Sequence, residues 1–208
     1  VMLYVGEFKE RLNITMGYSL KKTQVFSLIN FWWDLQKQSV QGKFSVSLFK
    51  SVCSHGLIDL YIQQKSKVQK RDFKRELNEL YTKTDLYVRS DKILTLAADL
   101  PILKELFAPS FNAFVAILKC QETLLELILK SIPDQQWDQE AEAVKQVLAV
   151  IESLILSFEA DDFASIASGK IVLTQLLSQQ KLTFVGAENR SLHVMGLLET
   201  RTLDFDRV

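Results

Sequence analysis

Two long amphipathic stretches lie next to each other in this sequence and restrict its fold most strongly. The first, SFNAFVAILKCQETLLELILKSI, covers residues 110–132, and the second, DQQWDQEAEAVKQVLAVIESLILSF, covers residues 134–158. Apolar residues recur at helical spacing in both, on one face formed by Leu118, Leu125 and Leu129 and another formed by Val144, Leu148, Ile151 and Ile155. Because the hinge is only Pro133–Asp134, the sequence predicts an antiparallel helical hairpin.

Helical periodicity also dominates the segments before this hairpin. Thr23 is a typical helix-capping residue, and the stretch after it predicts a helix that ends before Gly42. Its apolar stripe is Val25, Phe26, Ile29, Trp32 and Trp33. The pattern further predicts a short helix over 44–55 stopped by Gly56, a charged helix over 65–83, and a short apolar helix between Pro101 and Pro109.

Strand-like alternation is confined to the two ends of the sequence. RLNITMGYSL predicts a strand that ends at Gly17, whereas KLTFVG and SLHVMGLL predict two strands separated by the turn AENR. A helix over 162–180 precedes the last two strands. We therefore expect a mainly α fold with short β-strands at both ends. These strands need a sheet elsewhere to complete them, and the first residue, Val1, suggests that the chain is cut at its N-terminus.

Composition limits the partners that this chain can bind. With 208 residues, 48% of them hydrophobic, the chain can form a core, and a formal net charge of +0 means that attraction to nucleic acid requires a local basic patch. No signal peptide or membrane-length apolar run is evident, so we expect a cytoplasmic protein that does not enter membranes. Cys53 and Cys120 are far apart in sequence, which indicates thiols used for packing in a reducing compartment.

Two short motifs resemble catalytic signatures without meeting their chemical requirements. ASGKIV lacks the first glycine of a phosphate-binding loop, and Ile171 occupies the position of the Mg²⁺-binding hydroxyl, so Gly169–Lys170 is expected to be helical. PDQQWDQEAEAVK resembles a metal-dependent nuclease core, but Glu142 and Lys145 are three residues apart in a helical pattern. An ion-paired helix face explains them better.

Histidine and tryptophan offer weak functional signals. His55 and His193 have no Cys or His partners at metal-ligand spacing, so no metal site is expected, and His193 fits a surface or edge position. The Trp32–Trp33 pair either stacks on bases or contributes to the core. Helical spacing with Phe26 and Ile29 favours the core for at least one of the two.

A basic stretch within the predicted charged helix is the candidate phosphate-contact surface. Its cations are Lys65, Lys67, Lys70, Arg71, Lys74 and Arg75. Lysine and arginine side chains on one helix face neutralise phosphates and produce salt-dependent binding. Asp72 and Glu76 interrupt the stretch, so an ordinary solvated helix is the alternative.

The two ends of the sequence resemble helicase motifs. The C-terminal stretch LHVMGLLETRTLDFDRV resembles motif V of UvrD-like superfamily 1 helicases, with matches at Val194, Met195, Arg201, Leu203, Asp204, Phe205 and Val208. LNITMGYSLKKTQVFSLI resembles the motif IV region of bacterial AddB-like helicase–nuclease subunits. The residues of these motif-like segments are Thr15, Met16, Gly17 and Tyr18, and Gly196, Leu197, Leu198, Glu199, Thr200, Arg201, Leu203, Asp204 and Phe205.

The resemblance implies a division of the chain and a role for it. Residues 1–23 and 180–208 would be edges of a 2A-like motor domain, and residues 24–179 a helical 2B-like insertion. The parent protein would be an exodeoxyribonuclease subunit with a PD-(D/E)XK nuclease domain that repairs DNA double-strand breaks by recombination. A helicase partner subunit would supply ATP-driven movement. The chain itself would be non-catalytic, bind DNA weakly through the basic helix face, and need no cofactor.

Departures from the helicase pattern support an inactive motor. Gly196, Leu198 and Thr202 stand where the family has a hydroxyl donor, an imidazole and a glycine, whereas Ser19 and Gln24 replace two usual prolines. Arg201 keeps a positive charge that either contacts a phosphate or pairs with a neighbouring acid, Glu199 or Asp204. Exposed strand edges are expected to allow self-association.

The rival hypothesis is a helical protein–protein interaction module without a nucleic-acid role. It is built on the same helical hairpin over 110–158 and treats the Lys65–Arg75 stretch as a solvated helix face. Duplex binding that weakens steeply with salt separates the two hypotheses.

Overall fold

The structure of the chain is a computed structural model, which describes residues 12–14, 18–107, 113–133, 138–158, 166–182 and 192–194. These residues are mainly helical, as predicted. The described elements are, in chain order, β1 (Leu12–Ile14), β2 (Tyr18–Ser19), the 3₁₀ helix η3 (Leu20–Lys22), α1 (Gln24–Gln38), β3 (Lys43–Ser45), α2 (Val46–Cys53), α3 (Gly56–Gln69), α4 (Phe73–Glu79), β4 (Tyr87–Arg89), α5 (Ser90–Leu94), α6 (Ile102–Phe107), α7 (Phe114–Leu129), α8 (Asp138–Ser157), α9 (Ile166–Gln179), β5 (Lys181–Leu182) and β6 (Leu192–Val194).

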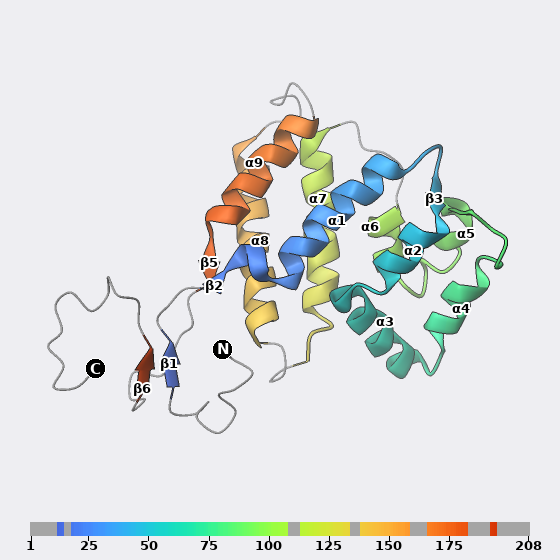
Figure 1. Cartoon of the computed structure of the whole chain (residues 1–208), viewed down its shortest axis with the longest axis horizontal. Coiled ribbons are helices and arrows are strands. Elements are labelled where there is room, and N and C mark those ends of the chain that lie inside the picture. The colour runs from blue at the N-terminus through green and yellow to red at the C-terminus, as the bar shows by residue number, and fades with distance from the viewer. Residues whose placement is uncertain are drawn as a thin grey trace, which may run out of the picture.

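The helices α7 and α8 form the predicted antiparallel hairpin (Figure 1). Val144, Leu148 and Ile151 are buried on α8, and Leu118 and Leu125 are buried on α7. α9 packs against α8, and α1 crosses the hairpin, so other helices pack on the hairpin (Figure 1). The predicted starts at Ser110 and Asp134 lie outside the described residues.

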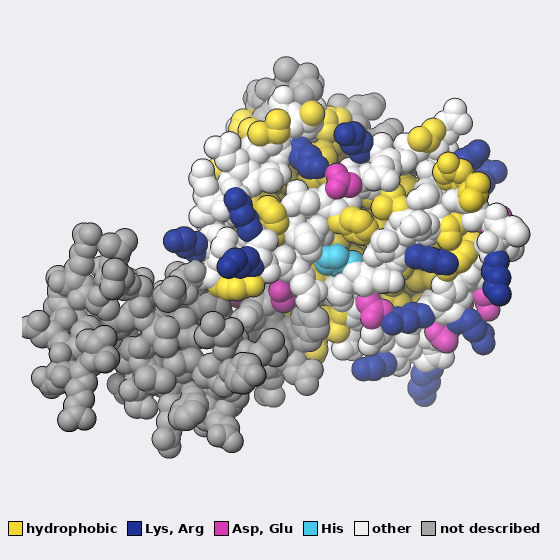
Figure 2. Space-filling model, viewed as in Figure 1, with side chains coloured by type: hydrophobic (Ala, Val, Ile, Leu, Met, Phe, Trp, Pro, Cys, Tyr) yellow, Lys and Arg dark blue, Asp and Glu magenta, His cyan; other side chains and the backbone are white. Residues whose placement is uncertain are grey.

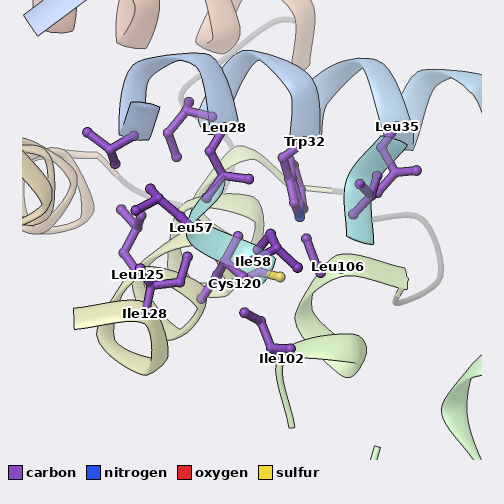
Figure 3. Packing of buried hydrophobic residues seen from close by; sticks show 14 of the residues in the cluster. Leu28, Trp32, Leu35, Leu57, Ile58, Ile102, Leu106, Cys120, Leu125 and Ile128 are labelled. Atoms are coloured by element: carbon purple, nitrogen blue, oxygen red, sulfur yellow. The ribbon is translucent and has the colours of Figure 1, made fainter. Parts of the chain in front are cut away.

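A single hydrophobic core joins this bundle to the smaller helices α2 to α6. Trp32 of α1 lies above Ile58 of α3 and Leu106 of α6, and Cys120 of α7 lies beside Ile58 in the same core (Figure 3). All four side chains are nearly inaccessible to solvent. Burial of this much apolar surface is the main favourable contribution to folding.

The start of α1 agrees with the sequence prediction and shows its cause. The Thr23 hydroxyl accepts a hydrogen bond from the Phe26 N–H at 3.4 Å, which satisfies one of the free donors of the first turn. The Glu140 carboxylate of α8 accepts a second one from the Gln24 N–H at 3.2 Å. Burial is the main influence on this carboxyl and raises its pKa, although these backbone donors act in the opposite direction.

Two helix boundaries differ from the sequence prediction. The predicted single helix over 65–83 is wrong, because α3 ends at Gln69 and the next residue, Lys70, has a left-handed φ of 51°. α4 begins after Asp72, whose carboxylate accepts a hydrogen bond from the Arg75 N–H at 3.1 Å. This break lets Phe73 turn into the core, where it is fully buried. Gly56 begins α3 instead of ending α2, and it lies against the amide end of the Gln24 side chain, which a Cβ at this position would displace.

A small antiparallel sheet inside the helical block was not predicted from the sequence. In this sheet β3 pairs with β4, with Phe44 opposite Val88. Gly42 has a φ of +69°, a left-handed value that favours glycine, so it belongs to the turn that leads into β3. Val88 and Phe44 are each 1% exposed, so the pairing is held by the core beneath it.

The strands near the two ends of the sequence pair with each other. β1 lies parallel to β6, with Leu12 opposite Leu192 and Ile14 opposite Val194. β2 lies antiparallel to β5, with Ser19 opposite Lys181. Both pairs therefore connect segments separated by the whole helical block, as Figure 1 shows. No helix in the described part of the chain is long and apolar enough to cross a membrane.

Candidate nucleic-acid interface

The predicted basic stretch is divided between two helices and the turn that joins them. Lys65 and Lys67 lie on α3, Lys70 and Arg71 lie in the turn, and Lys74 and Arg75 lie on α4. Lys65 is half-buried, and the other five side chains are exposed. The Lys65 ammonium stands over the Tyr61 ring, 5.7 Å from its centroid. The break at Lys70 means that the six cations do not share one helix face.

Acidic side chains neutralise half of these cations. Arg71 binds Glu76 at 2.7 Å and Asp99 at 2.5 Å. These hydrogen bonds, first to Glu76 and then to Asp99, raise the pKa of the Arg71 guanidinium. Lys74 pairs with Asp59 at 2.5 Å, and Arg75 with Glu79 at 3.4 Å.

The paired carboxylates reduce the electrostatic case for this surface. Asp59 and Asp99 come from other parts of the sequence, so they did not enter the sequence prediction. Figure 2 shows basic and acidic side chains interleaved over the α3–α4 end of the molecule. Surface ion pairs of this kind leave little net positive potential for a phosphate backbone.

A second group of lysines, which was not predicted from the sequence, lies where β2, η3 and β5 meet. Lys21 and Lys22 form the last turn of η3, and Lys181 begins β5 opposite Ser19. All three side chains are exposed. The adjacent pair Lys21–Lys22 was visible in the sequence, but Lys181 joins it only through the strand pairing. We call these three residues the junction lysines.

The tryptophan pair belongs to the core. Trp32 is 1% exposed and Trp33 is 6% exposed, and their rings meet edge to face with centroids 5.6 Å apart. The Trp32 indole N–H donates to the Glu105 carbonyl at 3.0 Å. Core packing, the favoured interpretation, is confirmed, and the base-stacking alternative is wrong.

The residues that decide the two motif-like sequences lie in helices, as expected, and residues 134–137 of the second sequence are outside the described residues. Gly169 and Lys170 lie within α9, and the Lys170 ammonium pairs with Asp34 of α1 at 3.3 Å. Glu142 and Lys145 form an ion pair of 3.8 Å on the surface of α8. No group of three His, Cys, Asp or Glu side chains suited to a metal ion occurs among the residues that the structure describes.

Both cysteine side chains are packed against other residues and remain protonated thiols at neutral pH. Burial, with a smaller contribution from Asp59, raises the pKa of Cys53 to about 12. Burial also raises the pKa of Cys120, whose thiol donates to the Glu105 carbonyl at 3.3 Å. A thiol rather than a thiolate at neutral pH is a poor nucleophile, which agrees with a packing role.

His55 contacts the exposed hydroxyl of Ser27 without forming a catalytic pair. The Ser27 Oγ lies 3.0 Å from the His55 Nε2 and donates its own hydrogen to the Gln24 carbonyl at 2.8 Å. The hydroxyl is therefore an acceptor from the ring. The ring also stacks on Phe31, and its Nδ1 is buried with no hydrogen-bond partner in the described parts of the chain. A nucleophilic serine needs the opposite arrangement, with a carboxylate orienting the ring.

The burial of His55 predicts a loss of stability in mild acid. Burial lowers its pKa below the ordinary value of 6.5, so the unfolded chain takes up the proton first as the pH falls through 6.5. The contribution of neutral His55 to stability is complete above this pH and is lost as the pH approaches the lowered pKa, with a slope of at most about 1.4 kcal/mol per pH unit. Urea unfolding of the wild type and His55→Gln, from about pH 7.5 to about pH 5, measures the difference.

The variant is the control for other titrating groups in this experiment. Glu140 contributes with the opposite sign, because its raised pKa makes the fold less stable as the pH rises. This contribution is common to both proteins and cancels in the comparison. Parallel pH profiles for the wild type and His55→Gln would show that His55 is not the responsible group.

Most of the motif-like residues lie outside the described residues. These are Thr15, Met16 and Gly17, and Gly196, Leu197, Leu198, Glu199, Thr200, Arg201, Leu203, Asp204 and Phe205. The backbone of His193 is described within β6. Tyr18 is 38% exposed, and its hydroxyl donates to the Lys22 carbonyl at 3.1 Å.

Comparison with known proteins adds no relative from which a function can be transferred. No protein-family description, curated protein or solved structure matches the chain. The functional argument therefore depends on the residues and on the fold.

Proposed function

We propose that this chain is the non-catalytic DNA-binding and scaffold region of a bacterial ATP-dependent helicase–exonuclease subunit that acts in double-strand-break repair and recombination. In this proposal residues 24–179 are a 2B-like helical insertion, and the flanking segments are edges of a 2A-like motor domain. The motif resemblance supplies the family. ATP hydrolysis and DNA cleavage are assigned to other parts of the assembly.

The parallel pairing of β1 with β6 supports this proposal most strongly. Parallel strands require a crossover connection, and here residues 15–191 make that connection, including the whole helical block. The strands carry Asn13 and His193, which belong to the motif IV-like and motif V-like segments. An insertion within a motor domain brings its two ends together in this way.

Within the described residues β1 and β6 form a sheet of two strands, which also supports a larger assembly. Parallel sheets are normally covered on both faces, and a two-stranded sheet is marginal in water. Leu12, Ile14, Leu192 and Val194 are the apolar positions of this pair. A larger parallel sheet, such as that of a helicase motor, is the natural environment for such strands.

DNA contact gives the proposal a direct test. We expect weak binding to a short blunt DNA duplex, with a dissociation constant of about 10⁻⁴ to 10⁻⁶ M at physiological salt. The affinity should fall at least about tenfold between about 50 and 200 mM salt, because bound lysines displace counterions from phosphates. Fluorescence anisotropy with a labelled duplex measures both quantities.

A duplex with an uncharged peptide backbone is the matched control for this titration. It keeps the bases and removes the phosphates, so binding to it should be undetectable. Equal binding to both duplexes, or binding unaffected by salt, would contradict the DNA contact.

The ion pairs on α3 and α4 favour the second candidate, a protein–protein interaction module. They neutralise Arg71, Lys74 and Arg75, which the DNA hypothesis had used. Apolar side chains are also exposed on the bundle, with Leu156 at 88% and Ile171 at 65%. Absence of duplex binding under low salt would favour this module.

A further inference from the structure

We infer that the junction lysines Lys21, Lys22 and Lys181 form the duplex-DNA contact of this chain, in place of the predicted basic stretch on α3 and α4. This inference rests on the proposed DNA-binding function and assigns its location. The ligand is the phosphate backbone of a DNA duplex, which cationic side chains bind without reading the base sequence.

Strand pairing brings the three lysines together from the two ends of the sequence. Lys181 is opposite Ser19 in the β2–β5 pair, where neighbouring strands lie about 4.8 Å apart. Lys21 and Lys22 follow Ser19 within one 3₁₀ turn, which rises only about 2 Å per residue. The backbone positions of the three lysines are therefore close together, at separations comparable with the spacing of successive phosphates.

The backbone that carries these lysines is held in place from two sides. The Leu20 N–H donates to the Gln180 carbonyl at 3.2 Å, and the Tyr18 hydroxyl donates to the Lys22 carbonyl at 3.1 Å. Beneath them, the Leu20 and Leu182 side chains are 0% and 3% exposed. A fixed backbone reduces the ordering cost of binding, because only the lysine side chains must become ordered.

The junction lysines have no carboxylate partner among the residues that the structure describes. In the described ranges, no Asp or Glu lies within ion-pairing distance of any of the three. The nearby carboxylate of Glu140, on α8, accepts hydrogen bonds from the Gln24 N–H at the start of α1 instead. Figure 2 shows fewer acidic side chains over this end than over the α3–α4 end. Among the described residues, none of the junction lysines takes part in a salt bridge, whereas three of the six cations of the predicted stretch do.

The experiment compares two triple variants with the same change in charge. The first replaces Lys21, Lys22 and Lys181 with glutamine. The matched control replaces Lys65, Lys67 and Lys70 with glutamine, because these three cations of the predicted stretch have no acidic partner in the described part of the chain. Each variant is titrated with the labelled duplex over a series of salt concentrations. Circular dichroism and thermal unfolding verify that both are folded.

We expect the junction variant to flatten the salt dependence and the control to keep it. Each phosphate contact contributes about 0.9 to the slope of log affinity against log salt, so three contacts contribute about 2.7. Between about 50 and 200 mM salt, the wild type should therefore lose about 40-fold more affinity than the junction variant. If the triple variant does not fold, the single variant Lys181→Gln should reduce the slope by about 0.9.

The other outcomes separate failure of this inference from failure of the proposed function. A flattened slope in the control with an unchanged junction variant would overturn the inference and keep DNA binding. Equal partial flattening in both variants would also overturn it, because the contact would then be spread over the surface. A wild-type chain that shows no salt-dependent binding would remove the proposed DNA contact itself, and the inference with it.

Discussion

Replacing Phe107 with alanine is expected to lower the free energy of unfolding by about 3–5 kcal/mol. Phe107, at the end of α6, is fully buried and meets Phe44 of β3 with ring centroids 5.0 Å apart. It also meets Phe49 of α2 at 5.4 Å. One ring therefore joins three elements, and its removal leaves a cavity that none of them can fill alone. Urea unfolding followed by circular dichroism measures the change.

The control for this prediction is an exposed aromatic ring from the adjoining sheet. Tyr87 of β4 is 60% exposed, so Tyr87→Ala should change stability by no more than about 0.5 kcal/mol. If Phe107→Ala does not fold, Phe107→Leu should show an intermediate loss, because it retains most of the apolar volume. Equal effects of Phe107→Ala and Tyr87→Ala would contradict the packing described for the core.

Gly169→Ala is expected to destabilise the protein by about 1–3 kcal/mol, the overpacking range. Alanine in a helix ordinarily stabilises relative to glycine by about 1 kcal/mol, so the expected sign is reversed. The cause is the Phe114 ring, which a Cβ on Gly169 would overlap. Phe114 is 3% exposed and stacks on Trp33 with centroids 6.4 Å apart, so the ring has little room to move.

A double-mutant cycle identifies the Phe114 ring as the obstacle. Phe114→Leu alone should destabilise the core, but it should cost less in the Gly169→Ala background because the smaller side chain accommodates the new methyl group. We expect a coupling energy of about 0.5–3 kcal/mol between the two changes. Additive effects, or stabilisation by Gly169→Ala alone, would contradict the close contact of α9 with α7.

The sequence predicted those elements whose signals are local. Thr23 identified the start of α1, and the apolar faces of α7 and α8 identified the hairpin, because helix capping and helical periodicity depend on residues within a few turns. The break after Lys70 was missed. Its local cue, the Asp72 cap, was outweighed in the sequence by the continuous run of charged residues.

The strand pairings could not be predicted from local sequence signals. β3 and β4 are three residues each and are separated by the three helices α2, α3 and α4, so neither is a distinctive strand in isolation. Strand pairing depends on contacts between distant segments, and burial of Phe44 and Val88 stabilises it. The pairing of β1 with β6 was expected only through the motif resemblance of the two ends.

By itself, the sequence determined that the chain forms a mainly helical fold around an antiparallel hairpin, because the periodicity of apolar residues specifies which helix faces must be buried. It also determined that Gly169–Lys170 and Glu142–Lys145 are helical pairs. Only the tertiary structure decided which cations are balanced. Asp59 of α3 pairs with Lys74 of α4, and Asp99 reaches Arg71 from a segment beyond α5, whereas Lys181 joins Lys21 and Lys22 across a strand pair. Electrostatic potential depends on distances in space, which the order of residues does not contain.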